Sequence, residues 1–138
     1  MDPWFTDGAY DGSWYQYPKV DPFSLISKPD LIYISHIHPD HYDPTFLRKL
    51  FDRYGDIPII IPDLKNNFLR FRALFDGFNP TPVKEKFIGN TRVVIKPNYT
   101  DSISDIDSAL YIYDGNAKKS FLNLNDCLYK EELVKDFK

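Results

Sequence analysis

The sequence predicts a single α/β domain, in which two strand–helix units are followed by a β-meander. Short apolar runs rich in β-branched residues alternate with two amphipathic segments in the first half of the chain. In the second half, strand-like runs are separated by turn pairs at 89–90 and 114–115. The chain has 138 residues, of which 43% are hydrophobic and 17% aromatic, so it is long enough to bury the core of one domain.

The first thirty residues are predicted to form a long structured loop. They are dense in aromatic residues, Gly, Pro and Asp, and they show neither helical nor strict strand periodicity. Their aromatic side chains either line a pocket for a sugar or a base or, as is more common, anchor the loop on the core. The residues concerned are Trp4, Tyr10, Trp14, Tyr15 and Tyr17.

The two strand–helix units follow this loop. The run "DLIYISHI" at 30–37 is short, apolar and β-branched, which predicts a buried strand. The segment "DPTFLRKLFDRYG" predicts a helix with Asp43 as N-cap, Pro44 at its first position and Gly55 as terminator. The run "IPIIIP" predicts a second buried strand, and "DLKNNFLRFRALFDG" predicts a second helix capped by Asp63.

The second half predicts a β-meander and a terminal helix. The runs "VKEKFI" and "TRVVIKP" flank the turn pair Gly89-Asn90, and two further β-runs flank Asp114-Gly115. From Asp126 onward the chain has a cap residue and apolar residues at i, i+4 spacing, which predicts a helix.

The composition excludes several classes of protein. The net charge of −3 and the pI of about 5.5 give no basic surface of the kind that binds nucleic acid. The apolar runs are far too short to span a bilayer, and the N-terminus lacks the layout of a signal peptide. The single cysteine, Cys127, excludes an intramolecular disulfide and is expected to be a small buried hydrophobe. We therefore expect a cytoplasmic protein whose partners include neither nucleic acid nor membrane.

All three histidines of the chain lie close together, in the stretch "HIHPDH". His36 and His38 stand two apart in an extended segment, so their imidazoles point the same way and form a natural metal pair. A turn at the proline brings Asp40 and His41 back towards that pair, which adds an oxygen ligand and a nitrogen ligand. The stretch therefore predicts a site for one or two divalent metal ions.

Such a site favours hydrolytic chemistry. A metal-bound water has a pKa near neutrality, and a nearby carboxylate, here Asp40, can orient it and accept its proton. A helix that begins at Asp43 beside the cluster would also favour a hydroxide or an anionic substrate. A catalytic triad would need one histidine beside a nucleophile, and a closed structural zinc site would draw on several cysteines. Both are weaker interpretations, as is a surface turn that happens to be rich in histidine.

The stretch "HIHPDH", between a hydrophobic run and a helix, resembles the H-x-H-x-D-H signature of the metallo-β-lactamase fold superfamily. Two further stretches are similar to that superfamily, namely "DPWF" near the N-terminus and "NLNDC" at 123–127. Together with "DGSWYQYPK", they most resemble the branch that contains CMP-N-acetylneuraminate hydroxylase-like proteins and ascorbate-6-phosphate lactonase-like hydrolases.

This resemblance implies an αββα sandwich and assigns roles to five residues. His36 and His38 would hold a first divalent ion, Asp40 and His41 a second, and Asp126 would bridge the two ions. Zinc is the favoured metal, with manganese and iron as alternatives. In such enzymes the bridging hydroxide attacks an ester, lactone, amide or phosphoester of a small-molecule substrate, and the hydroxylase-like branch is associated with nucleotide-linked sugars. Without the resemblance, Asp126 is better explained as the N-cap of the terminal helix.

The chain departs from the family pattern in three ways. The family's third histidine for the first metal should lie near "NYTDSISD", where Asp101 or Asp105 is the nearest substitute. A final histidine after the bridging aspartate and the opening strands before "DPW" are also absent. The resemblance therefore implies a single domain over residues 1–138 that is partial or truncated at both ends. Its uncovered edges would favour a homo-oligomer or a complementing polypeptide.

Two functions follow from these residues. The first is a metal-dependent hydrolase-like domain that is weakly active alone, because both ligand sets depend on Asp126. The second is a non-catalytic remnant or an assembly module of the same fold, which the absent third histidine keeps open.

Overall fold

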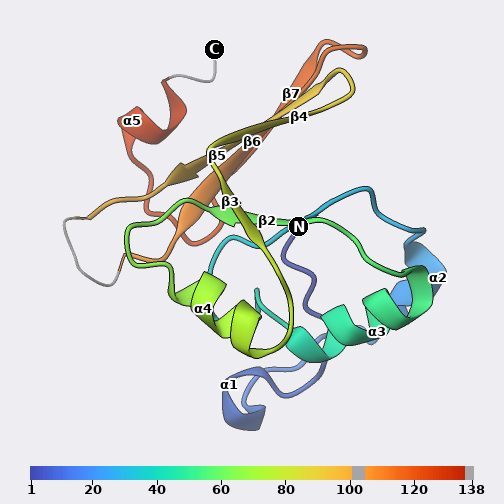
Figure 1. Ribbon diagram of the computed structural model, residues 1–138. Coiled ribbons are helices and arrows are strands. Elements are labelled where there is room, and N and C mark those ends of the chain that lie inside the picture. Colours follow the sequence, from blue (N-terminus) through green and yellow to red (C-terminus); the bar gives the residue numbers. More distant parts are fainter. Residues whose placement is uncertain (101–104, 136–138) are drawn as a thin grey trace.

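The computed structural model describes residues 1–100 and 105–135. Its first half alternates strands and helices, and its second half is a series of antiparallel strands (Figure 1). Within these residues, no helix has the length and the apolar character needed to cross a membrane. The elements in chain order are α1 (Ala9–Gly12), α2 (Pro22–Leu25), β1 (Ile32–Tyr33), α3 (Pro44–Tyr54), β2 (Ile59–Pro62), α4 (Phe68–Phe75), β3 (Thr81–Val83), β4 (Glu85–Ile88), β5 (Thr91–Pro97), β6 (Ser108–Asp114), β7 (Lys119–Asn123) and α5 (Glu131–Val134).

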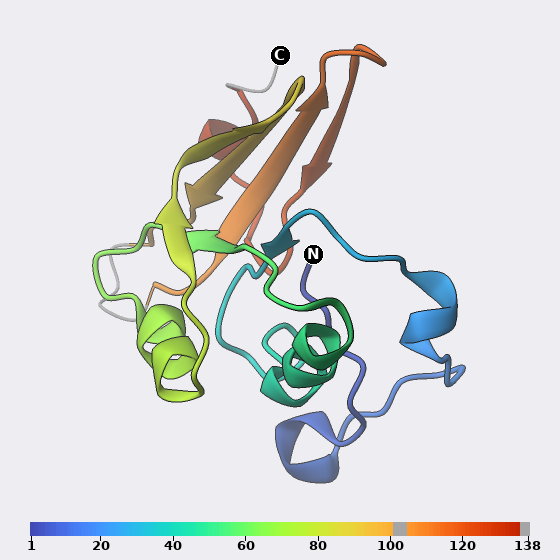
Figure 2. The same ribbon diagram turned by 45° about the vertical axis from the view of Figure 1, so that its right-hand side comes forward.

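The strands form two sheets that pack against each other (Figure 2). The first sheet is parallel with the order β1-β2-β3, and the second is antiparallel with the order β4-β5-β6-β7. Helices α3 and α4 cover the outer face of the first sheet, and α5 packs through Leu133 on Ala109 of β6. The predicted αββα sandwich is therefore present, and its second helical layer consists, within the described residues, of the short α5.

Strand β2 contributes to the two larger clusters of the hydrophobic core. Ile59 and Ile61 point into the cluster beneath α3 and α4, whereas Ile60 points into the cluster between the sheets. Successive side chains of a strand alternate between its faces, so a strand covered on both sides must be apolar throughout. All three isoleucines are buried, and each contributes about 1.5–3 kcal/mol of hydrophobic stabilisation.

Helix α3 begins and ends at the predicted residues. The Asp43 carboxylate accepts the N–H of Phe46 at 2.9 Å, and Pro44 occupies the first helical position. At the other end, Gly55 has a φ of 74°, a conformation that favours glycine. One face of the helix packs against the first sheet, so the cap signals and the apolar spacing agree.

The second helix begins later than predicted. It begins at Phe68 and not near Asp63, because Asn67 caps it by accepting the N–H of Arg70 at 3.0 Å. The Asn67 amide also donates to the carbonyl of Pro62 at 2.7 Å. One buried side chain thus joins the end of β2 to the start of α4, and this bond fixes where the helix begins.

Two other predicted elements are shorter than predicted, and three were missed: β3 and the short helices α1 and α2 within the predicted N-terminal loop. The first strand covers only Ile32–Tyr33, where it pairs with β2, and the histidines lie in the irregular segment beyond it. The terminal helix is reduced to α5, and the predicted N-cap Asp126 lies instead in a turn ahead of it. Strand β3 was not predicted because Pro82 lies within it, and Pro is tolerated there since β3 is an edge strand.

The β-meander of the second sheet is confirmed, with turns at 89–90 and 115–118. The start of β6 lies beside the segment that follows β1, where the Ser108 hydroxyl donates to the Ser35 carbonyl at 3.0 Å. The same hydroxyl lies 2.8 Å from the hydroxyl of Tyr33. This junction between the two sheets places the residues that follow β1 beside those that precede β6.

Candidate metal centre

The histidines lie just beyond β1, in a turn that returns towards the strand. The N–H groups of His41 and Tyr42 both donate to the carbonyl of His38, at 3.0 Å and 2.8 Å. This turn brings His41 back beside His36, with the two ring centroids 4.0 Å apart. The chain thus folds back after the proline, as the sequence predicts.

His36 and His38 face each other at short range. The Nε2 atom of His36 lies 2.8 Å from the Nδ1 atom of His38. The His36 side chain is fully buried, whereas His38 is half-buried. The extended backbone between them therefore presents two ring nitrogens to one point, and one of those nitrogens is held rigidly in the core.

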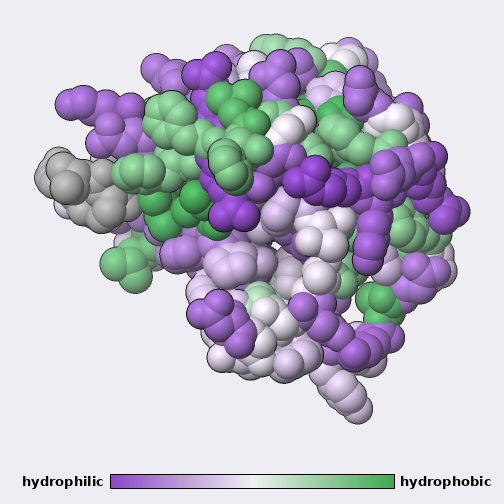
Figure 3. Space-filling model, turned by 60° about the horizontal axis from the view of Figure 1, so that its bottom comes forward, coloured by the Kyte–Doolittle hydropathy of each residue, from purple (hydrophilic) through white to green (hydrophobic). Residues whose placement is uncertain are grey.

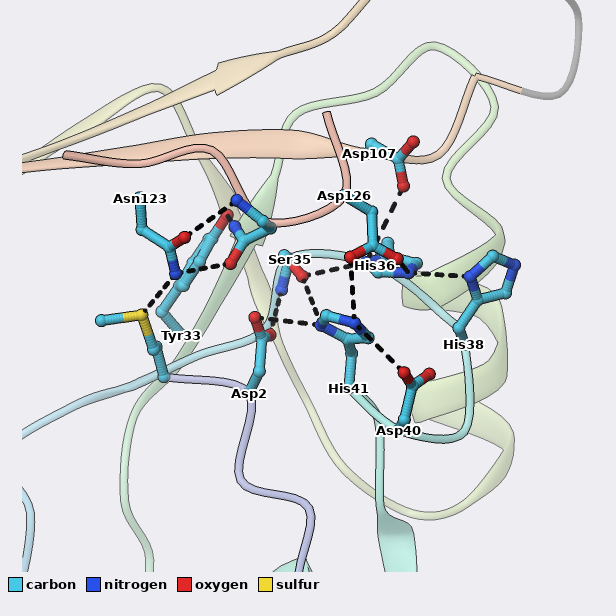
Figure 4. Close-up of polar contacts among 12 residues, drawn as sticks. Asp2, Tyr33, Ser35, His36, His38, Asp40, His41, Asp107, Asn123 and Asp126 are labelled. Atoms are coloured by element: carbon cyan, nitrogen blue, oxygen red, sulfur yellow. Dashed lines mark hydrogen bonds and ion pairs between the residues drawn. The ribbon is translucent and has the colours of Figure 1, made fainter. Parts of the chain in front are cut away.

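Asp126 approaches the histidines from the other end of the chain (Figure 4). Its Oδ2 atom lies 3.5 Å from Nε2 of His36, and its Oδ1 atom lies 3.5 Å from Nε2 of His41. Among the described residues, these three side chains each offer one ligand atom within 4.8 Å of the others. The carboxylate that was expected to bridge two ions therefore stands between the two imidazoles.

Asp40 lies on the same side of His41 as Asp126. Its Oδ2 atom is 3.6 Å from Nε2 of His41, and its Oδ1 atom accepts the hydroxyl of Tyr10 at 2.8 Å. The five residues that the sequence singled out are therefore neighbours: His36, His41 and Asp126 form the group of mutually close ligand atoms, and His38 and Asp40 adjoin it through His36 and His41 (Figure 4).

The opposite ring nitrogens of His36 and His41 are held from behind. The Oδ2 atom of Asp2 lies 3.2 Å from Nδ1 of His41, and the Ser35 hydroxyl lies 3.0 Å from Nδ1 of His36. Ser35 Oγ is also 3.2 Å from Nδ1 of His41. Histidines that bind metal usually donate their other N–H to a carboxylate or a similar acceptor, which fixes the tautomer and the ring orientation. Both Nε2 atoms are thereby turned towards Asp126.

The two buried histidines have pKa values shifted in opposite directions. Burial lowers the pKa of His36, and the neighbouring His41 adds to this effect, so His36 is neutral at neutral pH. Burial also opposes the charged form of His41, but its bond to Asp2 and the charges of Asp2, Asp40 and Asp126 raise its pKa. A neutral imidazole is the form that binds metal, and the carboxylates around His41 favour a cation in place of its proton.

One carboxylate near His36 was not predicted. The Oδ1 atom of Asp107 lies 3.8 Å from Nδ1 of His36, and it is buried without a hydrogen-bond partner among the described residues. Asp105, the suggested substitute for the missing histidine, instead accepts the N–H of Thr100 at 3.0 Å. Asp101 lies outside the described residues. The only sequence signal for Asp107 is its place directly before a strand.

Asp2 and Tyr10 were also missed as parts of this site. Both belong to the N-terminal segment, where composition predicts a structured loop but gives no partner for any one side chain. The similarity of "DPWF" to the superfamily was the signal that pointed to Asp2. Nothing in the sequence distinguishes Tyr10 from the other aromatic residues around it.

The predicted anion site at the start of α3 is occupied by the protein itself. The Asp43 carboxylate accepts the N–H groups of Phe5 and Thr6 at 3.1 Å and 2.8 Å, in addition to that of Phe46. A helix N-terminus carries partial positive charge that one carboxylate already offsets. The expectation that this terminus favours a hydroxide or a substrate was therefore wrong.

The structure also tests the alternative roles predicted for Asp126 and Cys127. Asp126 does not cap the terminal helix, because α5 begins at Glu131 and follows Lys130. Cys127 is buried, and burial together with the charges of Asp107 and Asp126 raises the pKa of its thiol to about 12. The interpretation of Cys127 as a small buried hydrophobe is confirmed.

Part of the chain is similar in sequence to known hydroxylases. It is 40% identical over 63 residues to the cytidine monophosphate-N-acetylneuraminic acid hydroxylase of Sus scrofa, which covers 44% of this chain and 14% of that protein. It is 41% identical over 65 residues to the Mus musculus enzyme of the same name, covering 46% of this chain and 11% of that enzyme. The chain thus spans a small part of these relatives, and no protein-family model matches it.

The whole chain is similar in fold to two solved hydrolase structures. The isothiocyanate hydrolase from Delia radicum gut bacteria aligns with a TM-score of 0.67 and 17% identity, covering 99% of this chain and 59% of that one. A protein described as a possible metal-dependent hydrolase, from Veillonella parvula DSM 2008, aligns with a TM-score of 0.66 and 12% identity, with the same two coverages. The chain therefore has the metallo-β-lactamase fold, and nearly half of it is similar in sequence to cytidine monophosphate-N-acetylneuraminic acid hydroxylases.

Proposed function

We propose that this chain is a metal-dependent hydrolase-type domain that binds one or two divalent ions. One observation carries the proposal: the two oxygens of Asp126 lie 3.5 Å from Nε2 of His36 and 3.5 Å from Nε2 of His41. The residues that would hold the ions are His36, His38, Asp40, His41 and Asp126.

The donor set fits a divalent transition ion. The Nδ1 atoms of His36 and His41 are engaged by Ser35 and Asp2, so both Nε2 atoms face Asp126, and a metal ion there would replace the contact between Nε2 of His36 and Nδ1 of His38. Imidazole and carboxylate ligands together suit zinc, which we favour, and also manganese or iron. The buried Oδ1 atom of Asp107, which has no hydrogen-bond partner among the described residues, adds a further carboxylate beside His36 that a nearby cation would stabilise.

A bound divalent ion would supply a Lewis acid and would lower the pKa of a coordinated water. We propose that Asp40 orients the attacking water and accepts its proton, since its carboxylate lies beside His41 at the surface of the cluster. The substrate class that we propose is a small-molecule ester, lactone, amide or phosphoester. The similarity to hydroxylases named for a nucleotide-linked sugar supports a sugar or a nucleotide sugar.

Metal content tests this proposal. Protein purified without chelator should contain zinc, manganese or iron by elemental analysis, and adding the ion should raise the unfolding temperature. His38→Ala should lose most of the metal, because it removes one proposed ligand, while the buried His36 keeps its contact with Ser35. Wild-type protein that holds no metal and gains no stability from any divalent ion would refute the proposal.

A second candidate function, an assembly module, is supported by the surface of α4. Phe71 and Phe75 are 65% and 87% exposed, and Phe68 and Leu74 on the same helix are also exposed. Hydrophobic side chains gather on the α4 side of the face shown in Figure 3. Contiguous exposed apolar side chains of this kind mark protein interfaces. We propose that this surface mediates self-association through α4.

We also propose that residues 1–138 form one domain whose sandwich another chain or segment completes. The two solved neighbours are longer, since the chain covers 59% of each. Strand β1 pairs with β2 alone among the described strands, and an apolar cavity of about 400 Å³ lies beside it, lined in part by Leu31, Tyr33 and Leu110.

The single buried cysteine supports a reducing compartment, which we propose is the cytoplasm.

A further inference from the structure

We propose that Tyr10 is a positioning residue, whose hydroxyl holds the Asp40 carboxylate in the orientation that faces the metal centre. The inference rests on the proposed metal centre and adds a residue to it. It is drawn from three observations: the bond between the two side chains, the backbone that presents Tyr10, and the packing of its ring.

The two oxygens of the Asp40 carboxylate have different contacts. The Tyr10 hydroxyl donates to Oδ1 at 2.8 Å, and Oδ2 remains 3.6 Å from Nε2 of His41. The last torsion of an aspartate side chain is broad, so a carboxylate on a turn has no strongly preferred orientation of its own. A donor that binds one oxygen therefore decides where the other oxygen points.

The backbone around Tyr10 adopts a conformation that ordinary residues avoid. Tyr10 has φ 52° and ψ 59°, and Asp11 has φ 56° and ψ 36°, so two successive non-glycine residues are left-handed. This conformation is unfavourable for residues other than glycine, because Cβ comes too close to the following carbonyl oxygen. Strained residues persist where the surrounding structure over-determines them, and they gather at functional sites.

Backbone bonds hold this left-handed turn in place. The N–H of Gly12 donates to the carbonyl of Gly8 at 2.9 Å, and the N–H of Trp14 donates to the carbonyl of Ala9 at 3.0 Å. Gly8 and Gly12 have φ values of 89° and 84°, so glycine stands at both ends of the strained pair. The local sequence thus permits the turn, and the turn sets the direction of the Tyr10 side chain.

The ring of Tyr10 is packed so that its hydroxyl stays in place. It lies against Trp14, with centroids 5.1 Å apart, and 6.2 Å from the ring of His38. Tyr10 is 36% exposed, and it therefore stands at the mouth of the site rather than in the core.

A double-mutant cycle separates this role from simple anchoring of the loop. The affinity for Co²⁺ is measured by competition with a chelator for the wild type, Tyr10→Phe, Asp40→Ala and the double variant, and the visible spectrum of each Co²⁺ complex is recorded. Tyr10→Phe should weaken binding about 10-fold and shift the spectrum, because removing a partner that orients a ligand has effects of this size. In the Asp40→Ala background the same change should have no further effect.

The matched control is Tyr17→Phe, since Tyr17 belongs to the same segment and is 97% exposed. It should leave Co²⁺ affinity, spectrum and unfolding temperature unchanged. Equal losses from Tyr10→Phe in both backgrounds, or none in either, would overturn the role of Tyr10 while leaving the metal centre intact. Wild-type protein that binds no Co²⁺ would instead overturn the metal centre, and the role of Tyr10 with it.

Discussion

Asp2 and His41 form a contact that joins the N-terminal segment to the histidine turn. Oδ2 of Asp2 lies 3.2 Å from Nδ1 of His41, and Oδ1 accepts the N–H of Ser35 at 2.6 Å. The backbone N–H of Asp2 also donates to the carbonyl of Tyr33 at 2.8 Å. One residue thus fixes the tautomer of a proposed ligand and the path of the chain between β1 and that ligand.

The first prediction is that Asp2→Asn lowers the pKa of His41. In the metal-free protein, His41 should titrate above an ordinary histidine, and the variant should shift it downward because a negative charge and an acceptor are lost. A raised pKa in the folded state stabilises the fold below about pH 6.5 and ceases to do so as pH rises through that pKa, so the variant should lose stability mainly at acidic pH.

Proton NMR measures the pKa of His41 directly, because the chain has only 3 histidines and their imidazole signals are few enough to assign. Asp52→Asn, on the exposed side of α3, is the control and should leave the three titrations unchanged. An Asp2→Asn protein in which His41 titrates as in the wild type would show that Asp2 is not its partner.

The second prediction concerns the bridging carboxylate. Asp126→Asn should weaken metal affinity by at least about 10-fold, since both proposed ligand sets include this residue. The Asp126 side chain is 50% exposed, so the metal-free variant should unfold at the wild-type temperature. Calorimetric titration with Zn²⁺ checks the affinity, with Asp114→Asn in the distant hairpin turn as control. Unchanged Zn²⁺ binding in Asp126→Asn would remove Asp126 from the site.

The third prediction is that Asp107→Asn has opposite effects with and without metal. Without metal, the variant should be more stable than the wild type, because a buried carboxylate oxygen that has no hydrogen-bond partner in the described part of the chain is replaced by a neutral amide. With metal, binding should weaken several-fold, because negative charge beside His36 is lost. Chemical denaturation with and without Zn²⁺ measures both. A loss of stability in the metal-free variant would contradict this account of Asp107.

The fourth prediction tests the assembly function. At micromolar concentrations, light scattering should give a mass above the 16.2 kDa of one chain. Replacing Phe71 and Phe75 by Ser should return it to one chain mass, since the two side chains are exposed and their removal leaves the core intact. Arg70→Ser, at the exposed position directly before Phe71 on the same helix, is the matched control. A wild-type protein that stays monomeric would exclude self-association through α4.

Features set by neighbouring residues could be predicted from the sequence. The limits of α3 follow from Asp43, Pro44 and Gly55, whose effects act within one helical turn. The turns of the meander and the convergence of His36 and His38 are equally local, because turn pairs and the spacing of side chains along an extended backbone decide them. The resemblance of one motif then supplied the fold, which the structure confirms.

Only the tertiary structure decided which distant residues serve the site. Tyr10 meets Asp40 from 30 positions away, and Asp2 and Asp107 reach the histidines from separate segments. The N-cap of α4, Asn67, is likewise held by a hydrogen bond to the carbonyl of Pro62 at the end of β2. These contacts depend on how two sheets pack and where a strained turn directs one side chain. Their energies arise between surfaces that are brought together by folding, so the spacing of neighbouring residues does not predict them, and a resemblance such as that of "DPWF" marks Asp2 without giving its partner.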